Sequence, residues 1–284
     1  MKNVPLFLLI LFAGMAASGY ILYTSYYSSA GVFLLFCGVI LGAATLIMKK
    51  EINLWAQKKS KSLPNQKEIE FLERTFTLAK YIPPHLKKSF YQRVNLFILD
   101  KEVIAQNQHK KVHHPVVLLC GAYAAFFDFD QPGLRVPLPG SPVYVFYNHP
   151  FPSPEFQNQL HISEYHPKDG AFLFSIPHLM KGNEAQDQYF NIALYETAKA
   201  TIMARQINIT DMPTIQILCT YGGYTLPDLE KYLGLSQEHI NQTALAITLF
   251  FINPSRFTQT FPTTGKTITD LFPMMHEHVS EKPS

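Results

Sequence analysis

Two long apolar runs open the chain. Residues 5–23 and residues 30–48 contain no charged side chain, and each is close to the ~20 residues that an α-helix needs to cross a bilayer. Only the six residues TSYYSS separate them. The pattern therefore predicts a transmembrane helical hairpin over residues 1–50. The first run also has features of a cleaved signal peptide, because Lys2 precedes it and small residues end it, but the second run directly behind it favours a retained hairpin.

Lysines flank the predicted hairpin and indicate its orientation. Lys2 precedes the first run, and five lysines follow the second: Lys49, Lys50, Lys58, Lys59 and Lys61. Because basic residues are retained on the cytoplasmic side, we expect a two-span protein of the cell membrane with both ends in the cytoplasm. Residues 51–67 are expected to form a basic juxtamembrane linker. Its lysines and Trp55 either contact anionic lipid headgroups or remain solvated.

The remainder of the chain reads as one α+β domain with helices in the majority, over residues 68–273, followed by a polar tail over residues 274–284. Apolar residues recur at three- and four-residue spacing, typical of helices, in residues 68–82, 84–104, 189–207 and 239–252. Short β-rich runs bounded by turn residues predict strands at residues 143–147 and 170–176. Residues 113–127 are apolar but too short for a third span, so we expect a buried helix or strand there.

Charge and cysteine content exclude some classes of protein. The net charge of +3 gives no reason to expect a nucleic-acid partner. Cys37, Cys120 and Cys219 are far apart in the sequence, so there is neither a disulfide framework nor a Cys-x-x-Cys zinc pattern.

The stretch NIALYETAKA, residues 191–200, has the outline of a zinc-protease helix with different side chains. Such a helix reads His-Glu-x-x-His, because residues at i and i+4 share a face and the intervening Glu acts as general base on a metal-bound water. Here Tyr195 and Lys199 take the two histidine positions, while Glu196 keeps the position of the base. Tyrosine is a poor zinc ligand at neutral pH, and lysine repels a cation. Taken alone, the pattern is that of an exposed Glu196–Lys199 pair on a helix surface.

Further fragments carry a resemblance. YIPPHLKKSFYQRVNLFILDKEVI, VYVFYNHPF, DGAFLFSIPHLMKG, NIALYETAKA and ALAITLFFINPSRF follow one another along residues 71–272. In their order and in their amino-acid sequence these fragments resemble the zinc-dependent peptidases of the Mlc titration factor A type, a gluzincin-like family with a His-Glu-x-x-His helix. The resemblance implies a metallopeptidase-like domain in which Asn191 and Glu196 keep family positions. The membrane hairpin lies outside it.

The resemblance also implies where a third zinc ligand belongs. Aligned on Phe250 and Phe251, the ligand glutamate of the family falls on Asn241, and a second glutamate falls on Thr248. Tyr195, Lys199 and Asn241 would then be degenerate ligand positions. The family is expected to bind zinc, and this chain lacks the ligands for it, so we expect no cofactor. Asn191 is a weaker candidate for a binding residue.

The remaining histidines, cysteines and acidic residues give weaker indications of a metal or catalytic site. The histidine pairs, His113 with His114, His161 with His166, and His276 with His278, lack ligand spacing. We expect Cys120 and Cys219 to be buried, inert thiols, residues Asp128 and Asp130 to form an acidic turn, and TYGGY to be a tight turn.

Three hypotheses follow. The first is a membrane-anchored, catalytically degenerate relative of zinc peptidases that binds a protein or peptide partner at the lipid bilayer. The second is an active peptidase, zinc-dependent or metal-independent, that uses Glu196 as base. The third is a structural or assembly protein of the membrane, in which Tyr195, Glu196 and Lys199 face solvent or core rather than a groove.

Overall fold

The computed structural model describes residues 4–60, 62–106, 111–129, 133–138, 140, 143–153 and 159–272, with the side chains of Gln57 and Ser60 left out. The predicted polar tail, and with it His276 and His278, lies outside the described residues, as does Asp130. The chain divides into two compact units, Met1–Ser62 and Leu63–Ser284. Each unit is described by itself.

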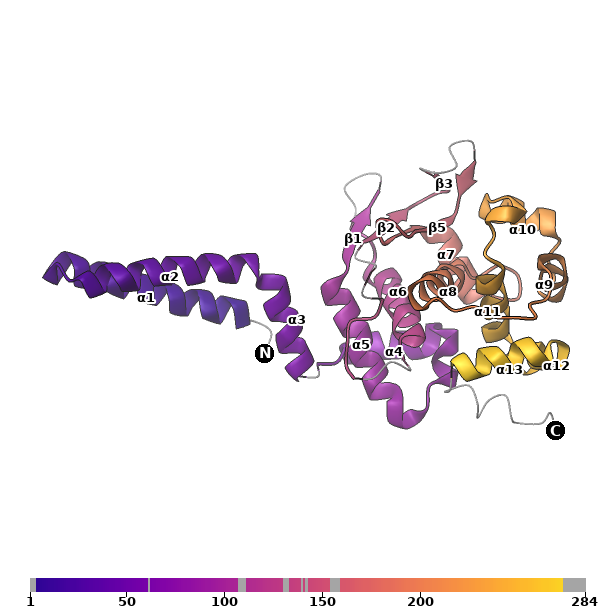
Figure 1. Ribbon diagram of the computed structural model, residues 1–284, viewed down its shortest axis with the longest axis horizontal. Helices are drawn as coiled ribbons and strands as arrows, with labels where there is room; N and C mark the ends of the chain where they lie inside the picture. The colour runs from indigo at the N-terminus through magenta and orange to yellow at the C-terminus, as the bar shows by residue number, and fades with distance from the viewer. Residues whose placement is uncertain are drawn as a thin grey trace. The chain divides into compact units, whose positions relative to one another are not determined.

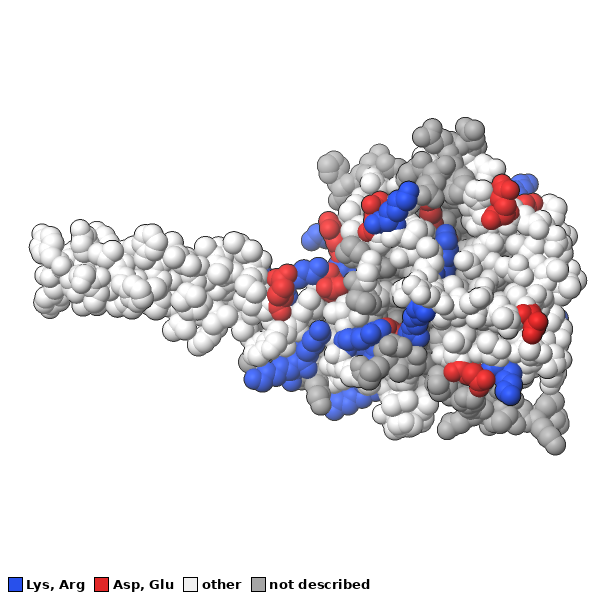
Figure 2. Space-filling view, in the orientation of Figure 1, with Lys and Arg blue, Asp and Glu red and all other residues white. Residues whose placement is uncertain are grey.

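The first unit is a helical hairpin followed by a third helix. Helices α1 (Val4–Tyr26) and α2 (Ser29–Ile47) are both long and apolar enough to cross a membrane. Neither helix contains a Lys, Arg, Asp or Glu, and the face of the hairpin seen in Figure 2 carries no charged side chain. The two helices approach closely at glycines: a Cβ atom at Gly19 would lie 2.4 Å from the backbone nitrogen of Leu35, so a larger residue does not fit there.

The basic segment behind the hairpin is helical over most of its length. Helix α3 (Lys49–Ser60) carries Trp55, whose side chain is exposed, and the Lys59 ammonium lies 5.0 Å from the Trp55 ring centroid. The linker predicted over residues 51–67 is therefore mostly α3, followed by a short connection to the second unit. That unit starts with a capping box, in which Asn65 accepts from the Glu68 N–H and Glu68 accepts from the Asn65 N–H.

The second unit is mostly helical with a small sheet, as the sequence predicts. Its α-helices are α4 (Gln66–Thr75), α5 (Lys87–Asp100), α6 (His114–Phe127), α7 (Ile176–Glu184), α8 (Ile192–Arg205), α9 (Ile215–Tyr221), α10 (Leu226–Leu233), α11 (Gln242–Ile252), α12 (Pro254–Thr260) and α13 (Pro262–Leu271). Short 3-10 helices cover Thr77–Tyr81, Pro84–Leu86 and Gln237–His239. The predicted helices at residues 189–207 and 239–252 are confirmed as α8 and α11, and the buried helix or strand expected at residues 113–127 is a helix, α6.

Four strands form the main sheet, in the order β1-β2-β6-β5. Strands β1 (Glu102–Ala105), β2 (Val143–Tyr147) and β6 (Ala171–Ser175) are parallel, whereas β5 (Ser163–His166) is antiparallel to β6. Strands β3 (Phe151–Pro152) and β4 (Leu160–His161) form a separate antiparallel pair. The strands predicted at residues 143–147 and 170–176 are confirmed as β2 and β6.

One predicted helix is wrong at its end. The pattern predicts a single helix over residues 84–104, but α5 ends at Asp100 and residues 102–105 form β1. Pairing of β1 with β2 decides the outcome, because Val103 and Ile104 are β-branched and continue the sheet outward. The helix predicted over residues 68–82 likewise ends at Thr75 and continues as a 3-10 turn.

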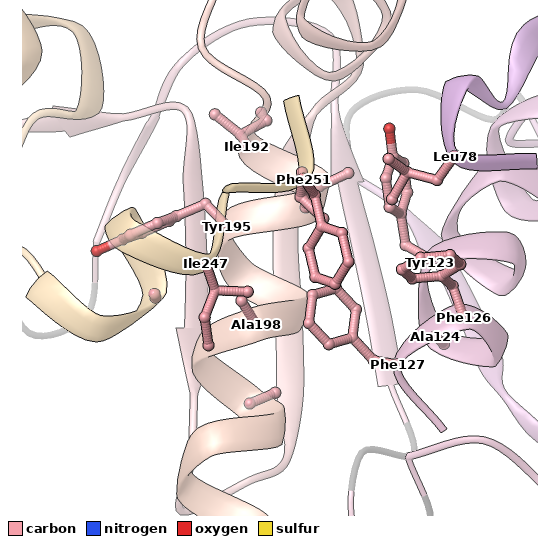
Figure 3. Close-up of a cluster of buried hydrophobic side chains, with 14 of the residues drawn as sticks. Leu78, Tyr123, Ala124, Phe126, Phe127, Ile192, Tyr195, Ala198, Ile247 and Phe251 are labelled. Atoms are coloured by element: carbon pink, nitrogen blue, oxygen red, sulfur yellow. The ribbon is translucent and has the colours of Figure 1, made fainter. Parts of the chain in front are cut away.

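Helix α8 runs through the middle of the second unit. It packs against α6, α11 and β5 (Figure 1). On the helix side of the sheet, aromatic side chains alternate inward from β2 and β6 and are fully or almost fully buried: Tyr144, Phe146, Phe172 and Phe174. Between α6 and α11, Phe126, Phe127 and Phe251 meet edge to face (Figure 3). The helix that carries the candidate site is thus surrounded by core.

Candidate functional site

Asn191 fixes the start of α8. As the N-cap residue it accepts from the Leu194 N–H through Oδ1 at 3.0 Å, and its Nδ2 donates to the Tyr123 hydroxyl at 2.7 Å. Tyr123 in turn donates to Asn183 Oδ1 at 2.8 Å, and Asn183 donates to the Thr75 carbonyl at 2.9 Å. Asn191 is fully buried, so its amide is used inside the protein to join α8, α6, α7 and the end of α4.

Glu196 lies one turn further along α8 and faces β5. Its Oε1 accepts from the Ser163 hydroxyl at 2.9 Å, and its Oε2 accepts from the Tyr165 backbone N–H at 3.0 Å. The Lys199 ammonium lies 3.8 Å from Oε2. Glu196 is only 1% exposed, so the exposed Glu196–Lys199 pair suggested by the pattern alone is wrong. The reason is that α8 is covered on the Glu196 side by a strand that the sequence did not reveal.

The contact with Tyr165 occupies one outward donor at the β5 edge of the sheet. In the antiparallel pair, Ser175 donates to the Ile162 carbonyl, so residues of the opposite parity, such as Tyr165, direct their backbone N–H groups away from β6. Such outward N–H groups are open to solvent or to an added strand. Here the Tyr165 N–H donates to the carboxylate of Glu196, and this hydrogen bond holds β5 against α8.

Tyr195 connects α8 to α11. Its side chain is fully buried and extends sideways from α8 with the hydroxyl at its tip (Figure 3). The hydroxyl oxygen accepts from the backbone N–H of Asn241 at 2.8 Å. Asn241 is the N-cap of α11, and its Oδ1 accepts from the Ala244 N–H at 2.9 Å. Burial, and secondarily the negative charge of Glu196, raises the pKa of the Tyr195 phenol far above its usual range, so the group is a neutral phenol.

These residues do not fit a zinc ion. Tyr195 is a neutral phenol that already accepts a hydrogen bond, the Asn241 side-chain oxygen caps α11, and Lys199 is a cation. Among the residues that the structure describes, no three His, Cys, Asp or Glu side chains are grouped as metal ligands would be. The donor set at these three positions therefore supports no catalytic step through a metal.

The histidines are placed on separate elements. His161 on β4 is buried, and its pKa is lowered by burial first and then by the positive charges of Lys199 and His239. His178 on α7 contacts the Ser175 hydroxyl at 2.8 Å, and burial lowers its pKa as well. His166 lies 3.0 Å from Asp169, and His114 lies 2.7 Å from Glu68.

Cavities lie beside the candidate residues rather than over them. A cavity of about 600 Å³ is bordered by Ile240 and by Gln242, the first residue of α11. A second, of about 410 Å³, lies between β4 and α10, with Leu160 and Gly234 in its wall. Neither cavity is lined by Tyr195, Glu196 or Lys199.

The remaining candidates have structural positions. Cys120 and Cys219 are buried, and burial raises the pKa of both thiols, which fits the prediction of inert cysteines. TYGGY forms the end of α9 and a turn in which Gly223 has a φ of 78°, a conformation that favours glycine.

Sequence reasoning missed two sets of residues. Ser163 and Tyr165 on β5 bind Glu196, but a four-residue strand with mixed polarity gives little pattern to detect. Asp128, expected in an acidic turn, is a buried carboxylate: Arg93 donates to its Oδ2 at 3.0 Å and Arg135 at 2.7 Å. Arg205 also approaches Asp128 and donates to the Phe127 carbonyl at the end of α6. No local signal in the sequence pairs Asp128 with Arg93, which is 35 residues away.

Comparisons with family models, with curated proteins and with solved structures found no match to this chain.

Proposed function

We propose that this chain is a membrane-anchored, non-hydrolytic protein with a metallopeptidase-like domain that binds a protein or peptide partner at the membrane. In this proposal the positions that the resemblance assigns to catalysis have been taken over by contacts that hold the fold together. Tyr195 and Asn241 join α8 to α11, and Glu196 joins α8 to β5.

The position of Glu196 is the observation that carries the proposal. A general base must lie within hydrogen-bond reach of a water or substrate proton. Both carboxylate oxygens of Glu196 instead accept from Ser163 and Tyr165, and the residue is 1% exposed. Freeing this carboxylate would leave a buried hydroxyl and a buried backbone N–H without their acceptor, which costs about 1–3 kcal/mol for each group.

The first unit supplies the membrane anchor in this proposal. Helices α1 and α2 would cross the bilayer, with Lys2 and the lysines of α3 on the cytoplasmic side of the cell membrane. Helix α3 begins with Lys49 and Lys50 and carries Lys58 and Lys59 in its last turn. Near an anionic surface each such lysine contributes about 1 kcal/mol of attraction, so α3 would lie at the lipid headgroups.

A structural or assembly role is the second candidate. It is favoured by the fact that Tyr195 and Glu196 face the core and that the two cavities near them are lined by other residues. The two candidates differ in whether the second unit offers a surface that recognises a defined segment of another protein. The active-peptidase hypothesis is disfavoured, because Tyr195, Lys199 and Asn241 do not suit zinc and Glu196 is already bonded.

The test is hydrolysis by the full chain. The protein would be purified in detergent without a histidine tag and incubated with denatured casein and with internally quenched peptides. Wild type and Glu196→Gln are expected to show the same product formation as a protein-free blank, and Glu184→Gln, an exposed glutamate on α7, is the matched control. Turnover by wild type and Glu184→Gln that is lost in Glu196→Gln would overturn the proposal.

A further inference from the structure

Strand β1 is one of the two edge strands of the main sheet, and among the described strands its sheet neighbour is β2. Gln106 donates its backbone N–H inward to the Phe146 carbonyl at 2.8 Å. Because alternate residues of a strand direct their backbone groups to the same side, Val103 and Ala105 direct their N–H and C=O groups outward, away from β2. These groups are a template for pairing with another extended segment.

A groove of about 720 Å³ runs beside this edge, where the end of α5 and the start of α6 meet the sheet. Four side chains give it an apolar lining: Ile98, Val103, Val112 and Val117. Val103 and Ala105 are in register with Tyr144 and Phe146, so their side chains lie on the helix side of the sheet, within the groove. A strand added at β1 would place alternate side chains over this lining.

The groove has a positive rim. Lys111 borders it, is exposed, and has no ion-pair partner among the described residues. Lys101 also borders it, but its ammonium is already used by the Leu138 carbonyl at 2.8 Å and by Asp100 at 3.0 Å. Glu102, the acidic residue of β1, is in register with Val143 and so lies on the opposite face of the sheet.

The two edges of the sheet therefore differ. At β5 the Tyr165 N–H is occupied by Glu196, whereas at β1 the outward groups of Val103 and Ala105 face a groove. We infer that the edge of β1 binds an extended peptide segment of a partner protein, which pairs with Val103 and Ala105, places apolar side chains in the groove and sets an acidic side chain against Lys111. This inference rests on the proposed function, since it names the surface through which the domain would bind its partner.

A synthetic peptide stands in for the partner segment and tests the inference directly. The probe is Thr-Val-Thr-Val-Thr-Glu-Thr with fluorescein coupled to its N-terminal amine and an amidated C-terminus, in which both valines and the glutamate share one face of an extended strand. One control replaces Glu with Lys. The other carries N-methyl groups on two consecutive central residues, so that one of the lost N–H groups faces β1 in either register. Binding to the full chain in detergent is measured by fluorescence anisotropy.

The Glu peptide is expected to bind, the Lys peptide about fivefold more weakly, and the N-methylated peptide at least about tenfold more weakly. Ala105→Pro removes one outward N–H at a position where an edge strand accepts proline, and should weaken the Glu peptide by a similar factor. Lys111→Glu should reverse the preference between the Glu and Lys peptides, whereas Lys266→Glu, an exposed lysine on α13, should leave it unchanged.

Failure of the Glu peptide to bind at about 1 mM, the range of a weak complex, or equal binding of the parent and N-methylated peptides, would overturn the inference. An unchanged preference between the Glu and Lys peptides in Lys111→Glu would also overturn it. Because Lys111→Glu changes only an exposed side chain, it keeps the inference testable even if Ala105→Pro does not fold. The same samples are analysed by mass spectrometry for cleavage. Cleavage of the probe would contradict the proposed non-hydrolytic function, whereas absence of binding without cleavage would contradict only the assignment of the β1 edge.

Discussion

The hydroxyl oxygen of Tyr195 accepts a hydrogen bond from the backbone N–H of Asn241 at 2.8 Å. The two residues are 46 positions apart, and both are positions at which the proposed resemblance to zinc peptidases would place a metal ligand. In this chain the phenol ties the first turn of α8 to the N-cap of α11. A bond within the fold thus stands where the resemblance implies a ligand.

Removing the Tyr195 hydroxyl should therefore cost stability. Tyr195→Phe keeps the buried ring but leaves the Asn241 N–H without its acceptor, and we expect the free energy of unfolding to fall by about 1–2 kcal/mol. Urea unfolding of the full chain in detergent, followed by circular dichroism, measures the change. Tyr189→Phe is the control, because no described residue bonds the Tyr189 hydroxyl, and it should be neutral. Equal stability of Tyr195→Phe and wild type would contradict a structural role for this hydroxyl.

Substitution of Asp128 should lower the free energy of unfolding more than substitution of an exposed acidic residue. It is buried and bonded by Arg93 and Arg135, with Arg205 at 3.9 Å. Asp128→Asn removes the negative charge that these guanidinium groups share, and breaking such a buried pair costs about 3–5 kcal/mol. Asp187→Asn, at an exposed position, should change stability by less than about 0.5 kcal/mol. A small decrease in the free energy of unfolding of Asp128→Asn, measured by the same urea titration, would show that burial of the arginine side chains does not require the Asp128 carboxylate.

The sequence predicts the secondary structure of the second unit well where an element is long or evenly patterned. The unbroken run of α8 and the β-rich centre of β2 are found as expected, whereas the apolar run of α6 left helix and strand open. Strand β1 is not, because Phe97, Ile98 and Leu99 extend the helical pattern up to Asp100 and only pairing with β2 shows where the helix must end.

The candidate site is less predictable, for a physical reason. The sequence places Tyr195, Glu196 and Lys199 on one helix, but whether Glu196 faces water depends on β5, which lies 31 residues earlier. Strand pairing between β5 and β6 determines that the Tyr165 N–H points at the carboxylate. Helical periodicity describes only one helix at a time, so it cannot supply a partner that arrives from another element.

Stability should fall in mildly acidic solution because of His161. Burial and the charges of Lys199 and His239 lower the pKa of His161 below its ordinary value of 6.5. Below about pH 6.5 the unfolded chain therefore binds more protons at His161 than the folded chain does. The contribution of neutral His161 to the free energy of unfolding is complete above that pH, and it is lost as the pH falls through the pKa of the folded state. His178 acts in the same direction.

Thermal unfolding between pH 7.5 and pH 5.5 checks this dependence. His161→Gln should flatten the decrease in the unfolding midpoint relative to wild type, whereas His113→Gln, at an exposed position, should not. An identical pH profile for wild type and His161→Gln would show that another group is responsible.

The membrane orientation gives a further prediction. If α1 and α2 span the bilayer with both ends in the cytoplasm, a reporter fused after Ser284 should be active only on the cytoplasmic side. Reversing the flanking charge with Lys49→Glu and Lys50→Glu together should weaken this preference, because these lysines directly follow α2. Activity of the wild-type fusion on the exterior side would contradict the proposed orientation.

The most direct test of the central claim is the stability of Glu196→Ala. If Glu196 is the acceptor that fixes β5 to α8, this change leaves the Ser163 hydroxyl and the Tyr165 N–H buried without it, and the free energy of unfolding should fall by about 3 kcal/mol. Glu196→Gln, which keeps an acceptor in place, should lose about 1 kcal/mol. A catalytic carboxylate is often held at a cost to stability, so its removal leaves stability unchanged or raises it. Unfolding of Glu196→Ala at the same or a higher urea concentration than wild type would contradict the structural role proposed for this carboxylate.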